Sequence, residues 1–163
     1  MSNEELKIKI VELLPSAIFE EGGDPTAIRW LNIEIAASEW LSFAQQLRNT
    51  KGLDFDYLFC LTCVDWPQAP AGKTHLTMVY HLSSTTHRHT IVVKSKLNRE
   101  KAEIETVSHI WRTAEFHERE VYELFGVNFL NHPDLRLLIL PEGWEGRNPM
   151  RKDYEDPVNI IKL

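Results

Sequence analysis

The strongest constraint on this sequence is the span 117–154, where a helical pattern, a proline turn and an apolar run follow one another closely. Thr113 is expected to cap the helix at its start, and Gly126 is expected to end it. The buried stripe of the helix, spaced i, i+3, i+7, i+10 and i+11, consists of Ala114, His117, Val121, Leu124 and Phe125. A helix with one such stripe must pack against another element.

Four charged side chains lie on the flanks and outer face of this helix. Glu118 and Glu120 fall on opposite flanks of the stripe, while Arg119 and Glu123 are spaced to pair on the outer face. Because residues two apart on a helix diverge by about 160°, the two glutamates do not converge on one substrate as a general acid and base would. Two interpretations remain for them: a solvated rim, or the border of a contact surface.

Cysteines and histidines offer little for catalysis or metal binding. Cys60 and Cys63 form a CxxC, but residues i and i+3 of a strand point to opposite faces, which favours core packing. His87 and His89 would share a strand face, yet no third ligand accompanies them. A stand-alone thiol or metal enzyme is therefore kept only as an alternative from another class.

Composition limits the class of protein further. With 163 residues the chain is expected to form one domain, and its net charge of −6 argues against nucleic-acid binding. Two cysteines make no disulfide framework, which indicates a reducing compartment. The charged start predicts no signal peptide, and no apolar run approaches the roughly 18 residues of a transmembrane helix.

Hydrophobic patterning predicts an α+β fold: a mixed or antiparallel sheet of about four strands, covered by helices, with an extended C-terminal tail. Residues 1–140 are expected to form a single domain and residues 141–163 the tail. The strand at 55–64 is almost continuously apolar, which is typical of burial on both faces. The other strands are expected at 31–35, 75–82 and 89–97, the last two as a hairpin, and the helices at 2–14, 38–51, 99–111 and 113–125.

The tail combines glycine and proline with aromatic and basic side chains. A disordered terminus is one interpretation. However, Trp144, Met150, Tyr154, Ile160 and Ile161 are costly to leave in water. A segment laid across the surface of a partner fits this composition better.

Residues 117–146, HEREVYELFGVNFLNHPDLRLLILPEGWEG, resemble the signature of the C-type subunit of NADH:quinone oxidoreductase, the 30 kDa subunit of respiratory complex I. The closing residues 151–154, RKDY, are also similar to that family, as are the run at 56–66 and the strand at 79–82. Two departures are local. The span 146–151 lacks the family's usual histidine, and Leu137 stands where a second arginine is common.

The resemblance implies a non-catalytic peripheral-arm subunit that scaffolds the quinone-site subunit of the complex, its D-type subunit. It implies no cofactor on this chain, with FMN, iron–sulfur clusters and quinone held by partner subunits. It further implies a peripheral place at the cytoplasmic face of the cell membrane, beside neighbouring peripheral-arm subunits. The expected interface residues, none of them catalytic or metal-binding, are Glu118, Arg119, Glu120, His132, Asp134, Arg136, Trp144, Arg151, Lys152 and Tyr154.

A second hypothesis keeps the family and changes the assembly. Equivalent subunits occur in ferredoxin-dependent photosynthetic complexes and in energy-converting hydrogenases. The sequence does not distinguish the electron donor, because the resemblance implies that the donor site lies on other chains.

Overall fold

The computed structural model describes residues 2–20, 30–68 and 74–156, and its centre is a five-stranded sheet. The strands run in the order β1-β2-β5-β4-β3, and only the β2–β5 pair is parallel, so the sheet is mixed. They comprise β1 (Ile18–Phe19), β2 (Leu31–Ile35), β3 (Tyr57–Trp66), β4 (His75–Ser84) and β5 (His89–Asn98). The predicted α+β class is confirmed, with one main-sheet strand more than the four expected.

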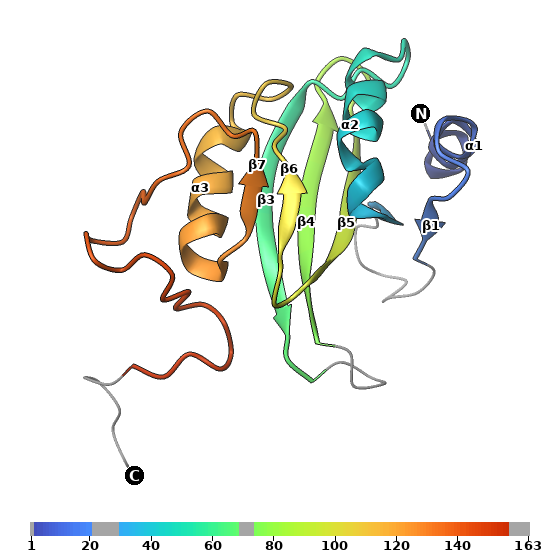
Figure 1. Ribbon diagram of the computed structural model, residues 1–163. Helices are drawn as coiled ribbons and strands as arrows, with labels where there is room; N and C mark the ends of the chain where they lie inside the picture. The colour runs from blue at the N-terminus through green and yellow to red at the C-terminus, as the bar shows by residue number, and fades with distance from the viewer. Residues whose placement is uncertain (1, 21–29, 69–73, 157–163) are drawn as a thin grey trace.

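Helices cover one face of this sheet (Figure 1). They are α1 (Asn3–Leu13), α2 (Trp40–Asn49), which follows a short 3₁₀ turn at Ala37–Glu39, and α3 (Ala114–Phe125). A parallel pair, β6 (Glu103–Glu105) and β7 (Asn128–Leu130), lies between α2 and α3. The largest fully buried side chains, Trp40 of α2 and Tyr80 of β4, are in contact, with ring centroids 4.2 Å apart and ring planes tilted by 37°. The core therefore lies between the sheet and this helical layer.

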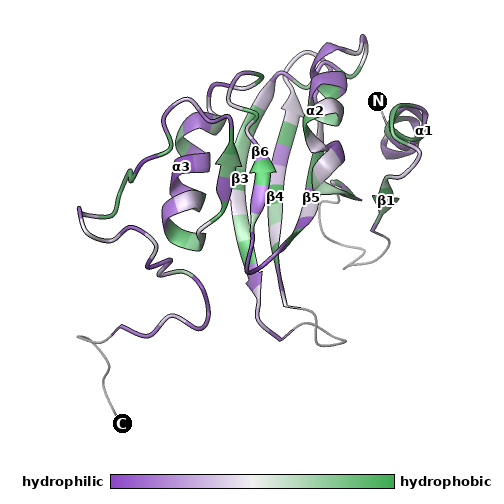
Figure 2. Cartoon of the chain, in the orientation of Figure 1, coloured by the Kyte–Doolittle hydropathy of each residue, from purple (hydrophilic) through white to green (hydrophobic). Residues whose placement is uncertain are grey.

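Burial alternates along the edge strand β3, whereas residues 76–80 of the central strand β4 are all buried. Figure 2 shows hydrophobic and hydrophilic residues alternating on the strands. In β3, Leu61 and Cys63 are buried while Thr62 and Val64 stay half-buried. The prediction that this strand is buried on both faces is wrong, because it is an edge strand that packs on α3 with one side. The hairpin of β4 and β5 is confirmed, with Ser84 paired to His89 at the turn.

The helix predicted at 99–111 is wrong. Its residues instead form β6 and a series of turns, because Ile104 pairs in parallel with Phe129 of β7. The backbone N–H of Val107 also bonds to the Glu118 side chain of α3, while its carbonyl accepts only the bonds of a turn from Ile110 and Trp111. Here long-range pairing overrides the local pattern.

Helix ends agree in part with the sequence. Ser2 caps α1 in a capping box with Glu5, as the pattern allows. Gly126 ends α3 with a φ of +74°, a conformation that favours glycine. Thr113 does not cap α3 with its side chain, because its hydroxyl donates to the carbonyl of Leu58.

After β7 the chain continues without helix or strand, and we call residues 131–156 the C-terminal segment. It runs over the outer side of α3 (Figure 1), and its far end returns to the sheet, where the backbone N–H of Lys152 bonds to Asp65 of β3. The expectations for Ile160 and Ile161 lie outside the described residues. No helix in the described ranges is long and apolar enough to cross a membrane.

Candidate functional site: the charged face of α3 and the C-terminal segment

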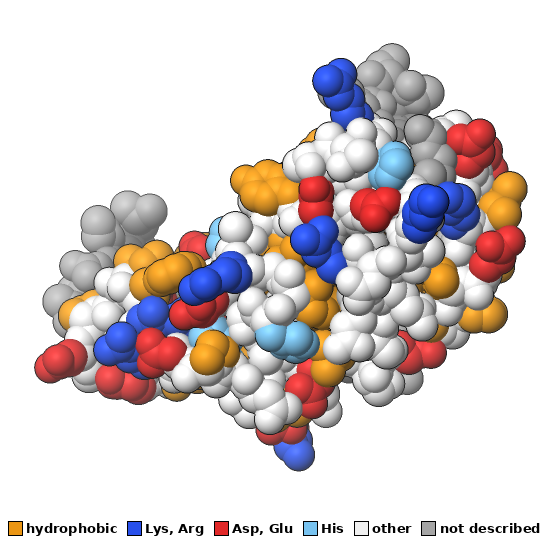
Figure 3. All heavy atoms as spheres, turned by 90° about the horizontal axis from the view of Figure 1, so that it is seen from above, with side chains coloured by type: hydrophobic (Ala, Val, Ile, Leu, Met, Phe, Trp, Pro, Cys, Tyr) orange, Lys and Arg blue, Asp and Glu red, His pale blue; other side chains and the backbone are white. Residues whose placement is uncertain are grey.

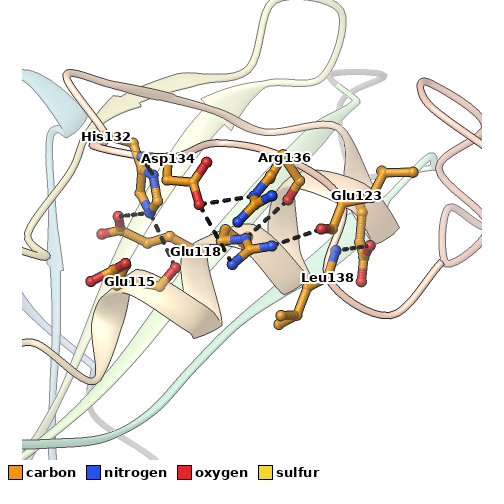
Figure 4. A network of polar contacts seen from close by, with 9 residues as sticks. Glu115, Glu118, Glu123, His132, Asp134, Arg136 and Leu138 are labelled. Atoms are coloured by element: carbon orange, nitrogen blue, oxygen red, sulfur yellow. Dashed lines mark hydrogen bonds and ion pairs between the residues drawn. The ribbon is translucent and has the colours of Figure 1, made fainter. Parts of the chain in front are cut away.

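The carboxylate of Glu123 holds the apolar run of the C-terminal segment by its backbone. It accepts hydrogen bonds from the backbone N–H groups of Leu138 (2.8 Å), Ile139 (2.9 Å) and Leu140 (3.1 Å), as Figure 4 shows in part. Glu123 is buried, although it belongs to the polar side of α3. Three successive N–H groups around one anion form a strong charge-assisted cradle.

Arg119 binds the backbone carbonyls of the two residues that precede Leu138 in the C-terminal segment. Its guanidinium donates to the carbonyl oxygens of Arg136 (3.1 Å) and Leu137 (2.7 Å) and lies 4.0 Å from the carboxylate of Asp134. The prediction that Arg119 and Glu123 pair with each other on the outer face is wrong, because the C-terminal segment folds back over them, buries both and takes their hydrogen bonds. Helical spacing identifies the polar face but not what covers it.

Glu118 lies deeper, inside the chain's own core. Its carboxylate accepts a hydrogen bond from the backbone N–H of Val107 at 2.8 Å and another from the hydroxyl of Thr106. Burial raises the pKa of Glu118 from 4.5 to about 7, and these two hydrogen bonds oppose the rise. The Nε2 of His132 lies 3.7 Å from this carboxylate.

His132 fixes the turn at which the C-terminal segment leaves β7. Its Nε2 contacts the carbonyl oxygen of Glu115 at 3.1 Å, and its Nδ1 contacts the backbone N–H of Asp134 at 3.0 Å (Figure 4). A carbonyl only accepts and an amide N–H only donates, so these partners assign the proton to Nε2. The buried imidazole thus links α3 to the His132–Pro133 turn.

A second anchor ties the far end of the C-terminal segment to the sheet. Arg99 binds Asp65 with two hydrogen bonds of 2.7 and 3.0 Å and reaches Asp153 at 2.6 Å. Asp65 also accepts from the backbone N–H of Lys152 at 2.9 Å, and the Lys152 ammonium lies 5.5 Å from the centre of the Trp66 ring. The Arg99 guanidinium lowers the pKa of Asp65 despite its burial.

The C-terminal end of α3 forms a third anchor. Arg151 donates from Nε to the carbonyl of Phe125 at 2.7 Å, and the backbone N–H of Met150 donates to the carbonyl of Leu124 at 3.0 Å. These are carbonyls that a helix end leaves without an intrahelical partner. A cation at this end also complements the helix dipole.

The predicted interface residues therefore occupy different depths. Glu118 and Arg119 are buried, and Glu120 and Asp134 are half-buried. Arg136 and Lys152 are exposed, while Trp144, Arg151 and Tyr154 are intermediate. Sequence reasoning missed the cradle at Glu123 and the pairing of Arg99 with Asp65. The latter joins residues 34 positions apart, and no local spacing signals it.

The thiol and metal alternatives find no built site in the described residues. Cys60 and Cys63 are free, and burial raises the pKa of Cys63 to about 12, which keeps this thiol protonated at neutral pH. His87 bonds to Asp54 at 2.8 Å, and His89 bonds to the carbonyl of Leu53 at 2.8 Å. Within the described ranges, no group of three His, Cys, Asp or Glu side chains is placed to hold a metal ion.

Comparison with known proteins gives relatives among respiratory subunits. The C/D subunit of the NADH-quinone oxidoreductase of Phocaeicola vulgatus is 44% identical over 132 residues, which are 80% of this chain and 24% of that protein. The C-type subunit of the F(420)H(2) dehydrogenase of Methanosarcina mazei is 43% identical over 103 residues, 63% of either chain. This chain thus spans about a quarter of the first relative and less than two thirds of the second.

A solved structure shares the fold and part of the sequence. A chain in the membrane-bound sulfane sulfur reductase, an archaeal respiratory membrane complex, superposes with a TM-score of 0.78 at 28% identity. The match covers 93% of this chain and 85% of that one. In addition, the family described as respiratory-chain NADH dehydrogenase, 30 Kd subunit, matches residues 33–158. The chain belongs to this family of complex I 30 kDa subunits.

Proposed function

We propose that this chain is a non-catalytic peripheral-arm subunit of a proton-translocating NADH:quinone oxidoreductase, in which it holds the D-type, quinone-site subunit in register. One observation carries the proposal: the Phocaeicola vulgatus relative unites the C-type and D-type subunits in one protein. Two subunits joined in a single polypeptide work in the same assembly, and the linkage raises their local concentration.

The C-terminal segment supports the proposal by its construction. It has no helix or strand of its own, yet the buried Glu123 and Asp65 bond to its backbone at two anchors, and at the third its own Arg151 bonds to the end of α3. A surface segment ordered before binding loses little conformational entropy on docking. The surface that we assign to the partner includes Glu120, Arg136, Trp144, Lys152 and Tyr154. The deeper Arg119 and His132 act through the C-terminal segment, and Glu118 acts through Thr106 and Val107, to which it bonds.

Electron transfer is assigned to other chains under this proposal. FMN, iron–sulfur clusters and quinone would be bound by partner subunits, and this chain would supply no catalytic residue. It would lie at the cytoplasmic face of the cell membrane, attached through the D-type subunit and neighbouring peripheral-arm subunits.

A second candidate keeps the scaffolding role and changes the electron donor. Two relatives favour it: a subunit of an F(420)H(2) dehydrogenase at 43% identity, and a chain of the membrane-bound sulfane sulfur reductase with a TM-score of 0.78. Neither relative carries NADH in its name. The donor-binding subunits that accompany the chain distinguish the two candidates.

Affinity purification of the tagged chain from membranes in mild detergent, with mass spectrometry of the bound proteins, tests both. We expect a D-type subunit together with flavin, iron–sulfur and membrane subunits, and the identity of the donor subunit selects the candidate. Recovery of the chain alone would overturn the scaffolding role. If that chain also held stoichiometric metal that Cys60→Ser removes, the stand-alone enzyme would replace it.

A further inference from the structure

Residues 137–140 turn their polar backbone inward and two aliphatic side chains outward. Leu138 is 39% exposed and Ile139 is 65% exposed, although both lie in the most apolar run of the C-terminal segment. Their N–H groups point the other way, into the buried carboxylate of Glu123. Exposed aliphatic surface is unfavourable in water, so this inverted arrangement calls for a partner that covers it.

The same hydrogen bonds restrict how a partner can bind here. The N–H groups of Leu138, Ile139 and Leu140 are taken by Glu123, and the carbonyls of Arg136 and Leu137 are taken by Arg119. A segment whose backbone donors are already bonded cannot join a sheet of another chain as an added strand. Recognition at this position must therefore use the side chains.

A charged pair precedes the exposed aliphatic pair in the chain. Arg136, which precedes the run, is 73% exposed and pairs with Asp134 at 2.9 Å. Figure 3 shows acidic, basic and hydrophobic side chains intermingled at the left end of the molecule, the end that the C-terminal segment forms in Figure 1. An apolar centre with a charged rim is the usual arrangement of an interaction hot spot.

We infer that Leu138 and Ile139 insert into a nonpolar recess of the D-type subunit, and that Glu123 and Arg119 position them for it. The inference rests on the proposed function, since the relative that unites the C-type and D-type subunits makes the D-type subunit the partner to expect. The roles inferred here differ from those expected from the sequence, which placed charged residues at the interface. Arg119 and Glu123 of α3 hold the segment, and Leu138 and Ile139 make the central contact.

The test compares two chains that lose exposed aliphatic side chains at opposite ends of the molecule. One is the double variant Leu138→Gln, Ile139→Gln. The control is Ile8→Gln on α1, where the native side chain is 62% exposed and glutamine favours the helix. Each tagged chain is purified from membranes in mild detergent, the D-type subunit is quantified, and the unfolding midpoint of the isolated chain is measured.

We expect the double variant to retain at most roughly a tenth of the D-type subunit, the control to retain all of it, and both midpoints to stay unchanged. Full retention by the double variant would overturn the inference while leaving the proposed function in place. If the native chain itself recovers no D-type subunit, the proposed function and the inference both fail. A native homodimer that only the double variant loses would assign the pair to a second copy instead.

The positioning role of Glu123 has its own readout. Glu123→Gln keeps the volume but replaces one acceptor oxygen with a donor that faces the N–H groups. We expect it to lower recovery of the D-type subunit, whereas Glu115→Gln in the first turn of α3 leaves recovery unchanged. If Glu123 acts through the aliphatic pair, adding the Glu123→Gln substitution to the double variant causes no further loss of the D-type subunit. A further loss of equal size would show that Glu123 contacts the partner independently.

Discussion

The sheet core and the C-terminal segment are built in opposite ways. Between the sheet and its helices, aromatic and aliphatic side chains such as Trp40 and Tyr80 are fully buried. Against the outer face of α3, charged side chains such as Glu123 and Arg119 are buried, and Ile139 is left in water. Burial of apolar area orders the first region, whereas charge-assisted hydrogen bonds to backbone groups order the second. The two regions should therefore respond to different perturbations.

Removing a large core side chain should affect the whole molecule. Phe43 of α2 is fully buried, so Phe43→Ala leaves a cavity and is expected to lower the free energy of unfolding by about 3–5 kcal/mol. Urea denaturation followed by circular dichroism measures the change. A loss below about 1 kcal/mol would show that the site collapses around the smaller side chain and that the core is loosely packed there.

Removing a charged anchor should act more locally. Arg119→Ala deletes the bonds to the carbonyls of Arg136 and Leu137 and is expected to cost about 1.5–3 kcal/mol. The freed carbonyls can reach water if the segment lifts off, which keeps the cost below that of the core cavity. Arg112→Ala, at an exposed position just before α3, is the matched control. Equal stability of the two variants would refute the anchoring role of Arg119.

The buried carboxylates of Glu118 and Asp65 should change the stability of the chain with pH in opposite directions. Since burial raises the pKa of Glu118 from 4.5 to about 7, the folded chain binds the proton more tightly than the unfolded chain. The stabilisation from Glu118 is complete below about pH 4.5 and lost as the pH rises to about 7, a change of about 3 kcal/mol. As the pH rises through that range, the free energy of unfolding of Glu118→Gln should therefore increase relative to that of the native chain by up to this amount.

Asp65 provides the opposite sign for comparison. Its pKa is lowered, chiefly by Arg99, so its contribution is present above its ordinary pKa of 3.8 and is lost as the pH falls through the lower folded value. Asp65→Asn should forfeit stability at neutral pH and recover relative to the native chain in acid. Stability curves against pH that run parallel for the native chain and both variants would contradict the assignment.

The smallest effect is expected at the surface. Ile139→Gln should change the free energy of unfolding of the isolated chain by no more than about 0.5 kcal/mol, because its side chain is largely in water. Differential scanning calorimetry of the native and variant chains checks this. A large loss would mean that Ile139 packs within its own chain, which would remove it from the set of partner-facing residues.

Much of the fold could be predicted from local pattern. The hairpin of β4 and β5, the strand β2 and the helix α3 follow directly from apolar periodicity, and Gly126 marks a helix end. The pairing of β6 with β7 could not be predicted, because it depends on residues 25 positions apart with only three residues in each strand. Such short strands exist because a neighbour is present.

In the candidate site, too, local sequence predicts one part and contacts between distant residues determine the other. The resemblance directed attention to the span that contains Glu118, Arg119 and Glu123, but it did not predict how deeply any of these side chains is buried. Depth depends on the C-terminal segment folding back, which brings the N–H of Leu138 within 2.8 Å of Glu123. Charged residues read from a sequence as surface can become buried when backbone groups satisfy them.

Amide hydrogen exchange of the isolated native chain and of Glu123→Gln tests the central claim most directly. The amides of Leu138, Ile139 and Leu140 are bonded to the Glu123 carboxylate, while their neighbour Glu142 is exposed. We predict slow exchange at the three amides in the native chain, fast exchange at Glu142, and loss of the protection in Glu123→Gln with the core amides of β4 unaffected. Equally fast exchange at all four positions in the native chain would contradict a segment held in place by α3.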